Sequence, residues 1–418
     1  MRPVRLKIEQ KLPLFGQCLP PLCRKLISLL VSCVAISIGA SWTTFSVWQN
    51  CMRAQLNQTE AESNIVFDIG NVGGTLSIVA SFLYESFGGQ LDTLIGGILA
   101  PSGYFLLATA TSEKYRGYFA ENIGFVCLGY FLAGYGSSFI YIATMMPNIE
   151  NAANHHRGKI VGLLDACNSL GPAVFAAIYN TWFTNGYVAS GEEILQNLSG
   201  FFLLLAFVTI SSCICMLLFV GRIHERGGRI AEDQLRLMPT VEEEISQFSE
   251  VPSKQYKLNE TVRRSSYVFL LLMFVLASCS QLTFQSNIPT FLKSFNLTEH
   301  NLLFNTLNMV LQAATKLAAG LISDLVASYG TMPRSIVFLL PYLFQALSLC
   351  ICIFVGDNFA VLLITCICVG MGYGVTWCQI PVITGELFGG SHLPSNLSSI
   401  MLMSGFTSKI IKILSRLI

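Results

Sequence analysis

The hydrophobic positions of this chain form long, nearly uninterrupted runs, without the short alternating patterns of soluble strands and helices. A helix of about 20 apolar residues crosses a bilayer, and the runs of that length lie at 24–48, 64–87, 91–111, 122–146, 157–181, 199–221, 266–291, 301–326, 334–355 and 358–381. A further run after residue 397 is ambiguous. The first run is too long for a signal-peptide core and lacks a cleavage site, so it is predicted to be a retained helix. The pattern predicts an all-α polytopic membrane protein.

Polar positions gather in two segments. We predict an N-terminal tail over 1–23, a six-helix bundle over 24–221, a linker over 222–265 and a second, apparently truncated helical bundle over 266–418. Two bundles joined by a charged linker are typical of transporters built from repeats. The linker mixes acidic and basic residues almost evenly, which favours a tether between moving halves over a lipid-binding patch.

Basic residues between the spans predict the orientation, because cytoplasmic loops carry an excess of Lys and Arg. Seventeen of them fall in the tail, the linker and the alternate loops on that side, against four on the other. The tail and the linker are therefore expected to be cytoplasmic. The N-x-S/T sequons at Asn57, Asn197 and Asn296 fall in exterior loops, where they would be glycosylation sites.

Composition agrees with the membrane assignment and excludes other classes. Hydrophobic residues make up 53% of the 418 positions and charged residues 12%, against roughly 25% charged in soluble domains. The net charge of +1 gives no basic field for nucleic acid. Most of the 14 cysteines lie in apolar runs, and we expect them to be small buried hydrophobic residues. HExxH, Walker and CxxC motifs are absent from the sequence, so we predict no enzyme, no metal site and no cofactor.

One cytoplasmic loop carries a recognisable pattern. Gly320-Leu-Ile-Ser-Asp324, followed by Gly330 and Arg334, resembles the signature loop of the major facilitator superfamily. The corresponding loop of the first half keeps Glu85 and Gly88 but lacks the expected arginines. The resemblance implies a fold of two bundles and twelve spans, of which 10 to 11 are present here. Glycines let helices approach closely, and the acids can accept from a helix N-terminus or a basic partner and hold a cytoplasmic gate shut.

Within that superfamily, several stretches resemble the nodulin-like group, distant relatives of monocarboxylate transporters. These stretches are Arg157-Gly158 through Asp165, Thr315-Lys316 before the signature loop, Glu386-Leu-Phe-Gly389 and Phe67-Asp68-Ile-Gly70. The resemblance places Arg157 in the gate motif and implies a small organic anion, such as a monocarboxylate, as the solute. Two positions depart from the group: Asp165 stands where relatives often carry Lys, and Lys316 stands where Arg is usual.

Ionisable side chains inside spans are costly and are therefore candidates for transport. Lys316 could attract an anionic solute, and Asp165 or Asp68 could bind a proton. Simpler alternatives are a Lys316–Asp165 ion pair, snorkelling of Lys316 to the surface, and a water-exposed Asp68 near its helix end. Gln285 and Trp377 are weaker candidates, since such residues more often mediate helix packing.

The favoured hypothesis is a secondary active transporter of a small solute that works by alternating access, with proton coupling as a further expectation. The alternative is a transport-inactive fragment or a transporter-like receptor. It arises because residues 397–418 must supply everything after the tenth span, and Lys409, Lys412 and Arg416 would share one face of an interfacial helix. The expected partners are the solute and the lipid bilayer of the plasma membrane or an organelle, with the oligomeric state left open.

Overall fold

The structure is a computed structural model that describes residues 20–115, 118, 122–152, 156–184, 197–221, 223, 255–295, 297, 300–329, 333–355 and 358–403. For some residues of the helices between 265 and 355, only the backbone is described. The secondary structure of the described residues is helical. The basic tail residues Lys409, Lys412 and Arg416, most of the linker and residues 1–19 lie outside these ranges.

The first bundle contains six long helical segments, several of them broken or bent. Its elements are α2 (Pro21–Gly39), η1 (Ala40–Thr44), α3 (Phe45–Gln55), α4 (Glu60–Thr75), α5 (Ile78–Phe87), α6 (Gly89–Ala110), α8 (Ile123–Asn151), α9 (Arg157–Ile178), η3 (Tyr179–Phe183) and α10 (Leu198–Phe219). The 3₁₀ segment η1 joins α2 to α3, and η3 is a π-helical turn. The predicted first and second spans are thus each built from more than one helix.

The second bundle contains four long helices and a shorter terminal one. Its elements are α13 (Leu258–Thr261), α14 (Ser265–Ser294), α15 (Asn301–Tyr329), η5 (Arg334–Phe338), α16 (Leu339–Val355), α17 (Phe359–Phe388) and a helix over 393–403. Nine helical segments of the described chain are long and apolar enough to cross a membrane. Within the described residues, α14 contributes a shorter apolar helix over Ser265–Gln281.

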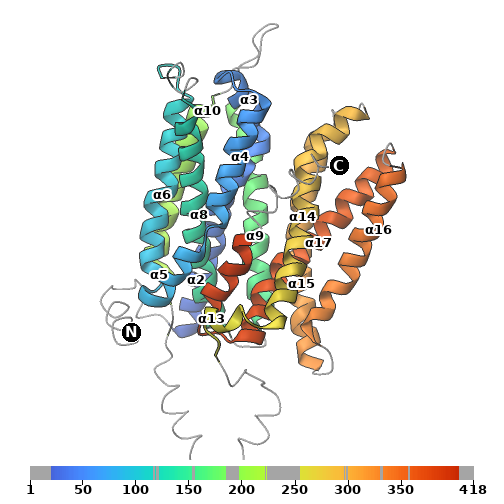
Figure 1. Cartoon of the computed structure of the whole chain (residues 1–418). Coiled ribbons are helices and arrows are strands. Elements are labelled where there is room, and N and C mark those ends of the chain that lie inside the picture. The colour runs from blue at the N-terminus through green and yellow to red at the C-terminus, as the bar shows by residue number, and fades with distance from the viewer. Residues whose placement is uncertain are drawn as a thin grey trace, which may run out of the picture.

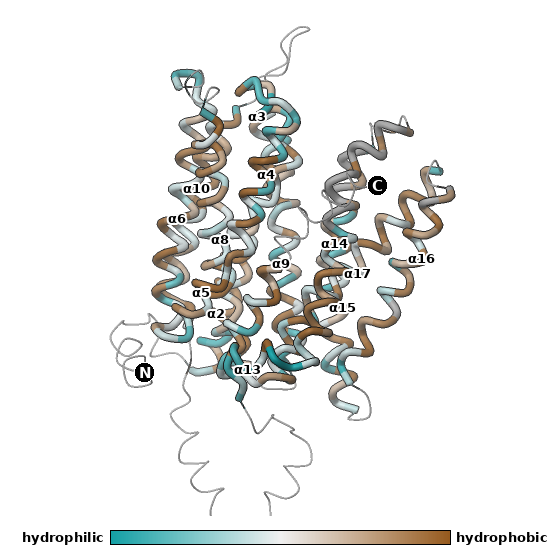
Figure 2. The backbone as a smooth tube through the Cα atoms, in the orientation of Figure 1, coloured by the Kyte–Doolittle hydropathy of each residue, from teal (hydrophilic) through white to brown (hydrophobic). Residues whose placement is uncertain are grey.

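The two bundles stand side by side and converge at one end (Figure 1). The short helix α13 lies at that end, which we call the linker end. The most extensive contact between the bundles joins α9 to α15, and α9 also touches α17. Hydrophilic residues gather at the ends of the bundles, while the long helices between them are largely hydrophobic (Figure 2). Many large apolar side chains are exposed on those helices, as lipid contact requires.

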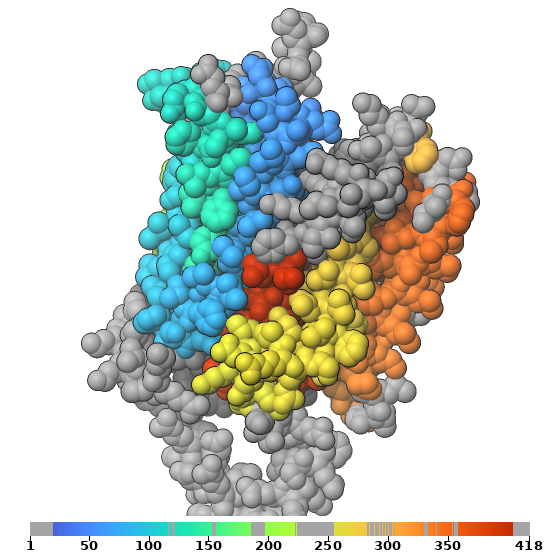
Figure 3. Space-filling view, viewed as in Figure 1, coloured from blue at the N-terminus to red at the C-terminus, as the bar shows by residue number. Residues whose placement is uncertain are grey.

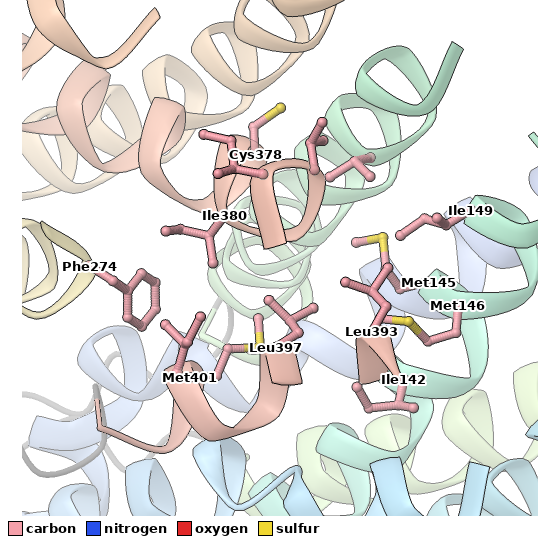
Figure 4. Packing of buried hydrophobic residues seen from close by; sticks show 14 of the residues in the cluster. Ile142, Met145, Met146, Ile149, Phe274, Cys378, Ile380, Leu393, Leu397 and Met401 are labelled. Carbon is pink, nitrogen blue, oxygen red and sulfur yellow. The ribbon is translucent and has the colours of Figure 1, made fainter. Parts of the chain in front are cut away.

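A shared apolar core fills the space between the bundles towards the linker end. Met145 and Ile149 of α8 lie in one buried cluster with Phe274 of α14 and with Leu397 and Met401 of the terminal helix (Figure 4). That terminal helix lies between the first bundle and the α13–α14 region (Figure 3). Packing of this kind keeps the linker end closed to water, so any open space must lie further along the bundle axis.

Candidate functional site

Asp324 connects the two bundles at the linker end. Its carboxylate accepts hydrogen bonds from the backbone N–H groups of Gly158, at 3.0 Å, and Lys159, at 2.8 Å. These amides belong to the first turn of α9, where helix N–H groups lack partners within the helix. Asp324 lies near the C-terminal end of α15, in the second bundle, and is 4% exposed. The acid therefore caps a helix of the opposite bundle, as the signature loop predicts.

The same acid is paired with a buried base. Arg334 Nη1 lies 2.9 Å from Asp324 Oδ1, and Arg334 Nε lies 2.5 Å from Glu386 Oε1. Arg334 itself is 7% exposed, while the Glu386 side chain is 45% exposed. Arg157 has both Glu386 and Arg334 as charged neighbours. Three of the predicted gate residues, Asp324, Arg334 and Arg157, thus belong to one charged cluster with the additional acid Glu386.

Glycines allow α9 and α15 to touch at this point. A Cβ on Gly158 would lie 2.7 Å from the backbone oxygen of Gly320, and one on Gly162 would lie 2.7 Å from the backbone oxygen of Lys316. A Cβ on Gly320 would in turn collide with the backbone of Gly158. The helices could not reach this separation with larger residues, so the glycines bring the Asp324 carboxylate within reach of the α9 amides.

Glu85 makes the matching contact in the opposite direction. It lies at the end of α5, in the first bundle, and its Oε1 accepts from the backbone N–H of Ser395, at 3.0 Å. Its Oε2 lies 3.1 Å from His392 Nδ1. The turn after it places Gly88 at φ 87°, which favours glycine. Each bundle thus contributes an acid to the start of a helix of the other bundle, and both contacts close the linker end.

We expect Glu85→Ala to loosen the linker end without unfolding the protein. The substitution removes both contacts to the start of helix 393–403, and a hydrogen bond to a charged group contributes about 1.5–3 kcal/mol. Hydrogen–deuterium exchange of the Ser395 amide should accelerate relative to the wild type. Glu113→Ala, at an exposed acid outside this end, is the matched control and should leave that exchange unchanged. Equal exchange in Glu85→Ala and the wild type would contradict the assigned contact.

A cavity of about 290 Å³ lies between the two bundles, beyond the closed linker end. Its wall includes Trp42 of η1, Asn71 of α4 and Asn168 of α9 from the first bundle, and Gln312 of α15 and Trp377 of α17 from the second. Gln49 and Asn64, from the α3–α4 region at the far end of the first bundle, also line it. The cavity is therefore shared by both halves and extends away from the linker end.

Lys316 is the one charged side chain among the described residues that line this cavity. It is 2% exposed. Its Nζ donates to the backbone oxygen of Asp165, at 3.2 Å, and lies 5.9 Å from the ring centroid of Trp377. Asp165 is fully buried, and its Oδ1 accepts from the Tyr141 hydroxyl at 3.2 Å. Asp165 Oδ2 has no hydrogen-bond partner, so the site holds an acid and a base whose hydrogen-bonding capacity is only partly used.

The other predicted transport residues fall in different places. Asp68 is half-buried on α4 and is not among the described residues that line the cavity. Gln285 lies on α14, but its side chain falls outside the described residues, as do Gly330 and Asn296. Asn57 and Asn197 are both exposed. Asn57 follows α3 and Asn197 precedes α10, at the end of the first bundle opposite the linker end (Figure 1). The roles of these residues stay predictions.

Two residues that take part in the contacts at the linker end were not among the predicted gate residues. Glu386 and His392 flank the second glycine turn, in which Gly389 has φ 88°. The usable signal is a repeated tetrapeptide, since Glu85-Ser-Phe-Gly88 and Glu386-Leu-Phe-Gly389 both end a helix with an acid three residues before a left-handed glycine. Such a repeat indicates two similar turns at the same end of the molecule.

A profile of the major facilitator superfamily matches residues 30–410, and the chain belongs to this family. A solved proton:xylose symporter of the superfamily, bound to 6-bromo-6-deoxy-D-glucose, is 16% identical, with a TM-score of 0.62 over 95% of this chain and 90% of that one. The E. coli fucose:proton symporter is 12% identical, with a TM-score of 0.64 over 94% and 92%. No curated protein matches the sequence.

The predicted class is therefore confirmed. The chain is an all-α, multi-pass integral membrane protein with the major facilitator fold, and it is a transporter, not an enzyme. A structure of a major facilitator transporter in the outward conformation also shares the fold, with a TM-score of 0.59 and 13% identity over 94% of this chain and 91% of that one. At these identities the solved structures show the fold alone, and the solute must be argued from the cavity.

Proposed function

We propose that this protein moves a small organic anion, such as a monocarboxylate, together with a proton by alternating access. The observation that carries the proposal is the position of Lys316, the single charge on the described cavity wall, directly beside the buried acid Asp165. An ammonium group with unused donors is a binding site for an anionic oxygen. Transmembrane ionisable groups that face a cavity commonly mark the path of a substrate or proton.

Charge balance links the anion to the proton. With Lys316 charged and Asp165 ionised, the empty site carries no net charge. An anion that enters alone adds an unpaired negative charge to a buried site, which is costly. If a proton binds Asp165 at the same time, Lys316 remains free to pair with the anion and the site stays neutral. One ammonium group matches one carboxylate, which favours a monocarboxylate over a dicarboxylate.

The closed linker end and the cavity beyond it support an alternating-access cycle. We propose that the linker end is cytoplasmic, as the distribution of basic residues predicts, so that the cavity described here faces outward. The exposed sequons at Asn57 and Asn197 would then lie on the exterior side as glycosylation sites.

The stretches around Arg157, Lys316 and Glu386 support a proposed place of this protein in the nodulin-like group. The linker over 222–265 is proposed to tether the two bundles.

The proposal is tested by uptake into lipid vesicles that contain the purified protein. Vesicles under an imposed pH gradient, acidic outside, are incubated with a defined mixture of monocarboxylates, dicarboxylates and neutral sugars, and their contents are measured by mass spectrometry. We expect monocarboxylates to accumulate and a protonophore to abolish the accumulation. Asp165→Asn should abolish the response to the gradient, because its amide cannot carry the proton. Accumulation of neutral sugars alone would contradict the proposal.

A further inference from the structure

Asp92 is a buried carboxylic acid that neither the linker-end contacts nor the cavity uses. It lies in the first turn of α6, four residues after the turn at Gly88. Its exposed fraction is 0%, and neither carboxylate oxygen has a hydrogen-bond partner. It is not among the described residues that line the cavity. A carboxyl group without any partner is rare inside a protein and calls for an explanation.

The helices packed against α6 contain no basic side chain that could pair with this acid. They are α5, α8 and α10. Their titratable side chains towards this region are Tyr84 and Glu85 on α5, Glu150 on α8 and Cys213 on α10. Tyr84 donates to Glu150 at 2.9 Å, and Glu85 is engaged with the terminal helix. Cys213 is buried against α6 one turn further along. Asp92 is fully buried, and none of the described residues forms a hydrogen bond to either of its oxygens.

An ionised carboxylate is strongly disfavoured in such surroundings. The side chain is fully buried, no described base is adjacent, and the backbone N–H groups of the first turn do not bond to either oxygen. A buried charge without a partner loses its hydration and gains nothing in return, so the group takes up a proton instead. Asp92 is therefore a neutral carboxylic acid while the linker end is closed.

The position of Asp92 connects it to the linker-end contacts. Tyr84 packs against Gly89, where an added Cβ would lie 3.2 Å from the tyrosine ring. The next residue, Glu85, holds the start of helix 393–403 across the bundle interface. The segment that covers the start of α6 is thus the one that contacts the other bundle. Breaking the Glu85 contacts would free α5 to move and admit water to Asp92.

We propose that Asp92 is a second proton-binding site, separate from Asp165, that holds a proton while the linker end is closed and releases it to water on that side when the end opens. The carboxylic acid gives its proton to water and becomes a hydrated carboxylate. This inference rests on the alternating access proposed above, but it does not depend on the solute. It makes opening of the linker end sensitive to the pH of the solution on that side.

The experiment follows the linker end directly, without a solute. Hydrogen–deuterium exchange is measured for the peptides that contain Gly158, Lys159 and Ser395, whose amides bond to Asp324 and Glu85. The protein is in phosphatidylcholine vesicles over a range of pH, with correction for intrinsic exchange. If opening releases one proton, the opening equilibrium of the wild type should increase with pH, by up to about tenfold per pH unit.

Asp92→Asn keeps the shape of the neutral acid and cannot ionise. It should exchange slowly at every pH, without the increase seen in the wild type, while Glu113→Ala, at an exposed acid outside the linker end, should retain that increase. Infrared spectroscopy supplies a second measurement: the carbonyl band of a protonated carboxylic acid should be weaker in Asp92→Asn than in the wild type at neutral pH. A pH response of Asp92→Asn equal to that of the wild type, or an unchanged carbonyl band, would overturn the proposal. If the pH response and the carbonyl band both behave as expected but no solute is transported, the solute proposal alone is contradicted.

Discussion

Replacing Lys316 by Met should reduce monocarboxylate uptake into vesicles by about 10- to 100-fold. The substitution keeps the length and apolar stem of the side chain but removes the one charge on the described cavity wall. A hydrogen bond to a charged group contributes about 1.5–3 kcal/mol, and each 1.4 kcal/mol corresponds to about a tenfold change in affinity. The measurement is the initial rate of uptake over a range of solute concentrations, with an increase in KM as the main effect.

Two further variants separate anion binding from a purely structural ion pair. Lys316→Arg keeps the positive charge and should retain transport, although its planar fork changes the geometry of the contact. The double variant Lys316→Met with Asp165→Asn removes both charges together. If the pair served only to hold α9 against α15, the double variant would restore both stability and uptake. Restored stability with absent uptake is the expected result, and full uptake by Lys316→Met alone would refute the assigned role.

The general architecture could be predicted from the sequence because the bilayer imposes strong constraints on it. Each span needs about 20 apolar residues, and the ten predicted runs all correspond to helices in the structure. The breaks within spans were less predictable. The first span changes to a 3₁₀ helix over Ala40–Thr44, and no proline marks the change in the sequence. Helix boundaries also differ, since α17 continues to Phe388 beyond the predicted end at 381.

The candidate site could be predicted in part from the sequence, for a different reason. Signature positions such as Asp324 and Arg334 have a local pattern, and the structure places them in contact. The meeting of Glu85 with His392 and Ser395 joins residues about 310 positions apart, and no local pattern encodes such a pairing. Asp92 illustrates the same limit. An acid at the start of a span is normally expected to face water, and only the packing of neighbouring helices shows that it is buried.

Asp324→Asn should open the linker end and strongly slow transport. The carboxylate accepts from two α9 amides and from Arg334, whereas an amide side chain brings one acceptor and an extra donor to a place already crowded with donors. Arg334 would also lose its buried partner, and breaking a buried ion pair costs about 3–5 kcal/mol. We expect faster hydrogen–deuterium exchange at Gly158 and Lys159, because their amides lose the carboxylate that protects them.

The size of that change decides whether the contact controls the transport cycle. Moving an equilibrium between two states from 1:99 to 99:1 takes about 5.5 kcal/mol, so the loss of this ion pair is large enough to make the open form prominent. Glu386→Gln is the matched control, because Glu386 contacts the same Arg334 from a half-exposed position, where ion pairs contribute little. It should change exchange and transport only slightly. If the two substitutions had equal effects, the closing role would belong to the charge of Arg334. If Asp324→Asn had no effect, the glycine contact between α9 and α15 would hold the linker end closed without the acid.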